Sequence, residues 1–214
     1  MDKIIEKTMK NLEKNNITAI YAESASEVKD IIKSLVPAGS TVSNGGSETL
    51  VKTGVIDLLY DGDYLYYDRV GLEGDKLRDC YIKAFGCDAY FCSSNAVTEN
   101  GELYNVDGNS NRVACIVYGP KQVIMVVGKN KIVPDIESAV KRVKQQAAPQ
   151  NTVRLQKKTP CAATGRCISL NSENSELCAG CLSPERICCN YVISAYQRHK
   201  GRIKVIIVNE DLGY

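Results

Sequence analysis

Residues 17–36 read ITAIYAESASEVKDIIKSLV, in which a mostly apolar run is followed by a helical pattern. The apolar run predicts a strand over residues 17–22. Ser24 and Glu27 then have the spacing of a helix-capping box, and the apolar residues from Val28 to Val36 recur as on one face of a helix. The stretch therefore predicts a strand that leads directly into a helix.

The same alternation continues on both sides of this stretch. Further strands are expected at four places, 41–43, 88–92, 122–127 and 204–208, with 64–70 as another extended piece. Helices are expected around 4–12, 50–59 and 75–85 and from Pro134, which can open a helix because its missing N–H is not needed in the first turn. Repeated strand and helix units predict an α/β fold, with a largely parallel sheet covered by helices on both faces.

The chain is expected to have three parts. Residues 1–150 form the α/β core, residues 151–190 a cysteine-rich metal-binding segment, and residues 191–214 a C-terminal helix and strand that return to the core. Residues 145–158 are polar and weakly periodic, which indicates a connector, and residues 187–199 are expected to be helical. The last strand, 204–208, should rejoin the main sheet.

The composition and the N-terminal residues indicate which binding partners and which cellular compartment to expect. The 214 residues carry 27 basic and 25 acidic side chains, a net charge of +2 that favours neither nucleic acid nor an anionic membrane as a partner. The first sixteen residues contain no apolar run that could serve as a secretory signal. A cytoplasmic location is expected, where thiols stay reduced.

Six of the ten cysteines lie between Cys161 and Cys189, and this cluster predicts a metal site. Thiolates are ligands that suit zinc or an iron–sulfur cluster, and the spacing does not separate the two. The alternatives are buried thiols, which fit less well with a loop rich in Gly, Pro, Ser and Asn, and a redox disulfide, for which no thioredoxin-like context precedes the cysteines. The other four cysteines, Cys80, Cys87, Cys92 and Cys115, are expected to be core residues.

Two polar segments are candidates for a ligand site. Gly45 and Gly46 stand where a strand meets a helix, and the N–H groups there, with the Ser47 and Thr49 hydroxyls, could bind a phosphate or carboxylate. Residues 95–112 follow a strand and contain Leu103 to Val106 as one strand of a hairpin. Its candidate ligand residues are Asn100, Asp107, Asn109 and Arg112, with Glu99 as a carboxylate nucleophile or base and Arg112 as an anion clamp. The plain alternatives are a simple turn and a solvated hairpin.

Four stretches together resemble the LUD-domain family, which is linked to lactate utilisation. They are GGSET (45–49), TENGELYNVDGNSNR (98–112), YGPKQVIMVVGKNKIV (118–133) and the cysteine pattern from TPC at 159–161 to SPERIC at 183–188. The resemblance implies the fold of CoA transferases and ribose-phosphate isomerase. It also implies four metal ligands, Cys161, Cys167, Cys181 and Cys188, while an insertion at 168–180 makes Cys178 an alternative ligand.

The resemblance implies a protein of lactate or related hydroxy-acid metabolism that binds a small anionic metabolite. The fold that the resemblance implies makes a CoA transferase or sugar-phosphate isomerase an alternative, and Glu99-Asn100-Gly101 is similar to the glutamate motif of CoA transferases. Another alternative is a non-catalytic subunit that docks onto an iron–sulfur or flavin protein. The sequence leaves open whether the chain forms a homo-oligomer.

Overall fold

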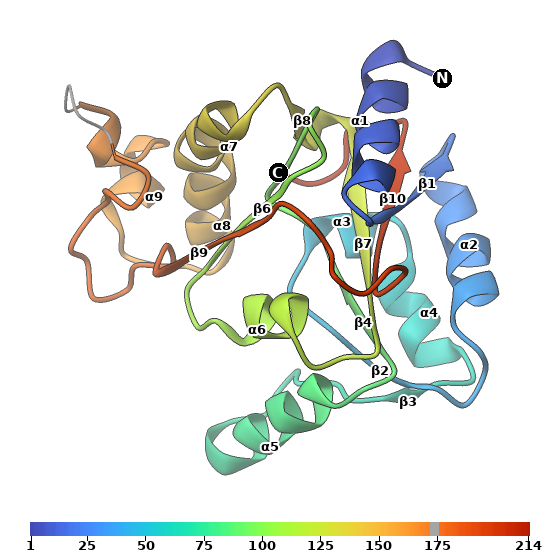
Figure 1. Cartoon of the computed structure of the whole chain (residues 1–214). Coiled ribbons are helices and arrows are strands. Elements are labelled where there is room, and N and C mark those ends of the chain that lie inside the picture. Colours follow the sequence, from blue (N-terminus) through green and yellow to red (C-terminus); the bar gives the residue numbers. More distant parts are fainter. Residues whose placement is uncertain (172–175) are drawn as a thin grey trace.

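The main sheet has six parallel strands. The structure, a computed structural model, describes residues 1–171 and 176–214 (Figure 1). The strand order is β1 (Thr18–Ala22), β10 (Ile203–Val208), β7 (Gln122–Gly128), β4 (Ala89–Cys92), β2 (Thr41–Asn44) and β3 (Leu65–Tyr66). The closing strand rejoins this sheet as expected, but it does so between β1 and β7 rather than at an edge.

Helices cover both faces of the main sheet. Val123, Met125 and Val127 of β7 belong to one buried cluster, with α1 (Lys3–Lys14), α5 (Gly74–Phe85) and α6 (Asn111–Val117). Ile124 and Val126 belong to the other, with α2 (Val28–Leu35), α3 (Glu48–Lys52) and α4 (Val55–Asp61). A strand buried on both faces explains the continuous apolar run in the sequence. The predicted α/β class with a parallel sheet is confirmed.

A second, mixed sheet of four strands lies beside the first. Its order is β8 (Ile132–Val133), β5 (Ala96–Thr98), β6 (Leu103–Asp107) and β9 (Asn190–Ser194). The hairpin of β5 and β6 was predicted, but the helix expected over 187–199 is wrong. Tyr191 pairs with Val106 and Ile193 with Tyr104, so pairing with a strand more than 80 residues away decides the conformation of this segment.

The connector expected over 145–158 is also wrong. Helix α7 (Ile136–Arg142) continues through a π-helical turn, η3 (Val143–Ala147), into α8 (Ala148–Arg154). Ala139, Val143 and Ala148 pack against Tyr104 and Val106 of β6, and this contact stabilises a helix that polar residues otherwise dominate. Pro134 stands outside α7, whose cap is Asp135, with its side chain accepting from the Ser138 N–H.

The remaining elements are short turns of helix: η1 (Ala25–Glu27), η2 (Lys129–Lys131), α9 (Pro160–Thr164) and η4 (Ile168–Asn171). The Ser24 hydroxyl does not cap the helix as its spacing predicted; the Glu27 carboxylate instead accepts from the Glu23 N–H. Among the helices of the described residues, none is both long and apolar enough to cross a membrane.

Candidate functional site

A cleft of about 490 Å³ opens at the carboxyl ends of the parallel strands. Gly46 and Ser47 follow β2, Ser93 follows β4, and Lys131 follows β7. The facing wall is formed by η3, by α8 with the residues that follow it up to Lys157, by the end of the cysteine segment and by the C-terminal Tyr214. In open α/β sheets this edge is where ligands bind.

The structure brings together some of the ligand residues expected from sequence and separates others. Those that line the cleft are Gly46, Ser47, Asp107, Asn109 and Arg112. Gly45 is buried, a Cβ there would meet the Arg112 side chain, and Thr49 is fully buried. Glu99 and Asn100 do not line the cleft.

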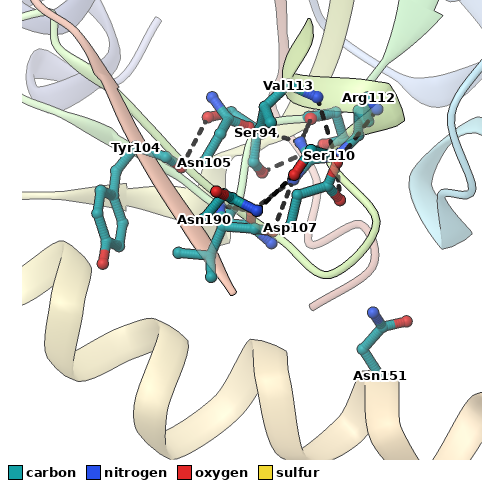
Figure 2. A network of polar contacts seen from close by, with 12 residues as sticks. Ser94, Tyr104, Asn105, Asp107, Ser110, Arg112, Val113, Asn151 and Asn190 are labelled. Atoms are coloured by element: carbon teal, nitrogen blue, oxygen red, sulfur yellow. Dashed lines mark hydrogen bonds and ion pairs between the residues drawn. The ribbon is translucent and has the colours of Figure 1, made fainter. Parts of the chain in front are cut away.

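Arg112 is fully occupied by the protein itself. Its Nη1 donates to Ser93 O and Asn105 Oδ1, its Nη2 donates to Asn95 Oδ1 and Val106 O, and its Nε lies 3.6 Å from Asp107 Oδ1. Figure 2 shows this network, with Asn151 on the facing helix. The side chain is therefore a cross-link between the end of β4 and strand β6, and not the free anion clamp expected from sequence.

Asp107 is occupied in the same way. Its Oδ2 accepts from the N–H groups of Arg112 and Val113, at 3.1 and 3.2 Å, and so supports the start of α6. A carboxylate that already accepts two backbone hydrogen bonds and faces a guanidinium has a structural role.

Arg69 has none of these partners. Among the described residues its guanidinium makes no hydrogen bond or ion pair, and its Nε is buried. A Cβ on Gly46 would lie 3.0 Å from Arg69 Nη2 and 3.6 Å from Arg154 Nη2. The two guanidinium groups therefore flank Gly46, and the absence of a side chain at Gly46 leaves room between them. We call Arg69 and Arg154 the arginine pair.

Arg154 is held in place but keeps part of its donor capacity. Its Nε donates to Tyr214 Oη at 2.7 Å and to Asn151 Oδ1 at 3.1 Å, and it lies 3.6 Å from the Glu48 carboxylate. Its Nη2 also donates to Asn151 Oδ1. Because α8 was expected to be a connector, the sequence offered no reason to place Arg154 at the site.

Lys131 is a buried amine that lines the cleft. Its residue is 3% exposed, and its Nζ lies 2.9 Å from Thr49 Oγ1 and 3.0 Å from Ser93 Oγ. Burial, together with the positive charges of Arg142 and Arg112, lowers the pKa of Lys131 to about 7. No carboxylate in the described residues forms an ion pair with it. Sequence reasoning missed Arg69 and Lys131, although Arg69 lies in the extended piece expected over 64–70 and Lys131 follows the strand expected over 122–127.

The cysteines expected to bind metal gather around a second, smaller cavity. A cavity of about 30 Å³ is lined by Cys161, Cys167, Cys181 and Cys188, whereas Cys178 is exposed. Burial and the neighbouring Cys161 and Cys167 thiols raise the pKa of Cys188 to about 12. Cys188 also lines the large cleft, so the two cavities share a wall.

Arg186 holds the cysteine loops together. Its Nε donates to Cys188 O, its Nη1 to Cys181 O, and its Nη2 to Cys178 O and Tyr191 Oη. The donor set of four thiols suits zinc or an iron–sulfur cluster. Within residues 1–171 and 176–214, no three His, Cys, Asp or Glu side chains are grouped as a metal ion would require. Part of the insertion at 168–180 lies outside the described residues.

The four scattered cysteines are core residues, as expected. Cys80, Cys87, Cys92 and Cys115 are all buried. Burial raises the pKa of Cys87 and of Cys92 to about 12. These thiols are therefore protonated at neutral pH and act as small apolar side chains.

Glu99 lies at the turn between β5 and β6, against α1. Its carboxylate is 2.8 Å from Lys7 Nζ, and its carbonyl accepts from Asn11 Nδ2. Asn15 Nδ2 donates to the carbonyls of Asn100 and Gly101. The triplet that is similar to a catalytic motif thus fastens the hairpin to α1.

The comparisons with known proteins agree with this architecture. The sequence model of the LUD domain matches residues 5–208. The crystal structure of a DUF162 family protein from Deinococcus radiodurans, at 1.70 Å resolution, covers 96% of both chains, with 16% sequence identity and a TM-score of 0.53. At that identity the likeness shows the fold alone. A search of curated proteins found no match. Because the match to the family spans nearly the whole sequence, this chain belongs to the LUD domain family.

Proposed function

We propose that this protein acts in lactate or related hydroxy-acid metabolism and binds a small organic anion in the large cleft. The observation that carries the proposal is Arg69, a cation with a buried Nε and no partner in the described residues, beside Gly46 and Arg154. A buried N–H without an acceptor is costly, and a carboxylate offers a partly buried guanidinium charge-assisted hydrogen bonds. A bound carboxylate or phosphate would therefore remove a cost that the free protein carries.

The chemistry of CoA transferases and sugar-phosphate isomerases, which the resemblance implies as an alternative, draws less support. A transferase mechanism through Glu99 needs its carboxylate at the ligand, and this side chain instead pairs with Lys7 outside the cleft. An isomerase of sugar phosphates needs an anion site and an acid or base, for which the arginine pair and Lys131 are the candidates.

We also propose that Cys161, Cys167, Cys181 and Cys188 hold a zinc ion or an iron–sulfur cluster, with Cys178 as an alternative ligand. All four line one cavity, and Arg186 donates to the carbonyls of Cys181 and Cys188; these contacts support the assignment. The described side chains would have to move closer together to bind the metal. A cluster would supply electron transfer, and zinc a structural clamp. Because Cys188 lines both cavities, a shift of Cys188 on metal binding would also change the wall of the large cleft.

A second candidate function is that of a subunit docked onto an iron–sulfur or flavin protein. Leu182, the residue after Cys181, is 97% exposed, and Cys178 is exposed as well. An apolar side chain so fully exposed beside the cysteine cavity would suit a partner surface. Co-purification of a flavin or iron–sulfur protein that Leu182→Glu abolishes would favour this function over that of a free-standing ligand-binding protein.

The anion site predicts a thermal shift that depends on Arg69. Pyruvate, lactate or phosphate at about 100 times its Kd should stabilise the protein by roughly 2.7 kcal/mol, which raises Tm by about 5–10 °C. Arg69→Met should abolish the shift, because the uncompensated cation is gone. Arg78→Met, on the exposed face of α5, is the matched control and should keep the full shift. No shift with any of these anions, or an equal shift in Arg69→Met, would contradict the proposal.

The metal assignment predicts which thiols are needed. Protein purified without oxygen should contain zinc, or iron with sulfide. Most of it should be lost in each of four variants, Cys161→Ser, Cys167→Ser, Cys181→Ser and Cys188→Ser. Cys189→Ser should retain the metal, because the exposed Cys189 does not line the cavity. Elemental analysis and the visible absorption spectrum measure this. Wild-type content in all four variants would rule out the assignment, and loss in Cys178→Ser would identify Cys178 as a ligand.

A further inference from the structure

Lys131 donates both of its hydrogen bonds. Thr49 Oγ1 donates its own proton to Leu212 O, and Ser93 Oγ donates to Ser94 O. Each hydroxyl can therefore only accept from Lys131 Nζ. A neutral amine has two N–H groups and one lone pair, so these two contacts use its protons and leave the lone pair without a partner in the described residues.

The charges around Lys131 favour this neutral form. Arg142, Arg112 and Lys52 are the cationic groups that act on it, and Cys92 is a protonated thiol. With the pKa of Lys131 at about 7, roughly half of the amine is neutral at neutral pH. Lysines become nucleophiles when they are desolvated or placed next to other cations, and both conditions hold here.

The C-terminal residues connect this amine to the arginine pair. A Cβ on Gly213 would lie 3.4 Å from Lys131 Nζ, and the next residue, Tyr214, accepts from Arg154 Nε through its hydroxyl. Lys131, Arg69, Arg154 and Tyr214 all line the same cleft. A ligand whose anionic group lies on the arginine pair therefore occupies the same cleft as the amine.

We propose that Lys131 Nζ is a nucleophile that forms an imine with the carbonyl carbon of an anionic ligand held by Arg69 and Arg154. The ligand class is an anion that also carries an aldehyde or ketone, such as a 2-oxo acid or an open-chain sugar phosphate. The inference rests on the proposed anion site and adds the chemical class of the ligand.

The reaction needs no oxidant or reductant. The Nζ lone pair attacks the carbonyl carbon, the C–N bond forms, and the carbonyl oxygen takes up protons. That oxygen leaves as water while the nitrogen loses its protons, which gives a C=N bond to the Lys131 side chain. Hydrolysis reverses each step and releases the ligand.

Trapping with borohydride tests this directly, because hydride converts the imine to a stable secondary amine. The wild-type protein is incubated at pH 7.5 with pyruvate or with ribose 5-phosphate, then reduced, digested and analysed by peptide mass spectrometry. We expect one adduct per chain at Lys131 with at least one of the two, and which one identifies the ligand source. Lactate, which has no carbonyl group, should give no adduct and should compete with labelling.

Lys204 is the internal control for a partly buried lysine outside the cleft. Burial lowers the pKa of Lys204 too, and its Nζ donates to Gln122 Oε1 and Gly201 O, yet it does not line the cleft. It should remain unlabelled in the same digest. Because both lysines are read in the wild-type protein, the test does not depend on the folding of Lys131→Met, which should give no adduct.

Three outcomes would overturn the inference. A thermal shift with pyruvate or phosphate, without an adduct at Lys131, would leave the anion site standing and remove the nucleophile. Equal labelling of Lys131 and Lys204 would show non-selective chemistry. Absence of both the shift and the adduct would remove the proposed anion site as well, so the two failures are distinguishable.

Discussion

Arg112→Met should lower the free energy of unfolding by about 3–5 kcal/mol, even though Arg112 lines the cleft. The substitution takes the Arg112 donor away from three acceptors, and they are Ser93 O, Val106 O and Asn105 Oδ1. The fourth acceptor, Asn95 Oδ1, keeps the hydrogen bond from the Val106 N–H. An unsatisfied buried acceptor costs about 1–3 kcal/mol, and water from the cleft would recover part of the sum. Urea unfolding measures the loss.

Arg69→Met is the matched control for this prediction. The Arg69 guanidinium makes no hydrogen bond or ion pair in the described residues, so its removal should leave the stability of the free protein unchanged within about 0.5 kcal/mol, or raise it. Arg112 should thus contribute to the stability of the fold, and Arg69 to ligand binding. Equal losses in the two variants would show that this division of roles is wrong.

Gly101→Ala, which adds one methyl group at the hairpin turn, should lower the free energy of unfolding more than any other glycine-to-alanine change near the hairpin. Gly101 has φ +85°, and a Cβ there would lie 2.6 Å from Asn11 C and 2.7 Å from Leu12 N. The left-handed conformation costs about 1–2 kcal/mol and the overlap with the α1 backbone about 1–3 kcal/mol more, a total of about 2–5 kcal/mol. Chemical denaturation of the variant and the wild type measures it.

Gly39→Ala separates the two contributions. Gly39 has φ +77° but open space where a Cβ would stand, so it should lose only the conformational part, about 1–2 kcal/mol. If both variants lost the same free energy of unfolding, the overlap of the added Cβ with the α1 backbone would contribute nothing to the loss. A larger loss of stability in Gly101→Ala than in Gly39→Ala would show that the turn Glu99-Asn100-Gly101 packs closely against α1, which is a structural role.

The main sheet could be predicted because its signal is local. The runs QVIMVV and KVIIV are apolar without alternation, which is what a strand buried on both faces requires. The position of β10 between β1 and β7 is a long-range pairing that no local pattern encodes. The same holds for β9, where pairing with β6 outweighed the helical pattern expected over 187–199.

The sequence predicted the part of the candidate site at the glycine turn, but not the part that consists of single basic residues. Gly46 and Ser47 could be found because the strand-to-helix turn has a known chemistry. Arg69 and Lys131 are isolated basic residues after strands, and only the fold shows that they share a cleft. The role expected for Arg112 differs from its geometry, because its acceptors come from four separate residues between 93 and 106.

The most direct test of the anion site is a crystal structure of the protein with pyruvate bound. The account predicts the pyruvate carboxylate on the Arg69 guanidinium, beside Gly46 and within reach of Arg154, with the carbonyl carbon towards Lys131 Nζ. A ligand bound at the Glu99 hairpin, or a carboxylate bound by Arg112 in place of its present acceptors, would contradict it.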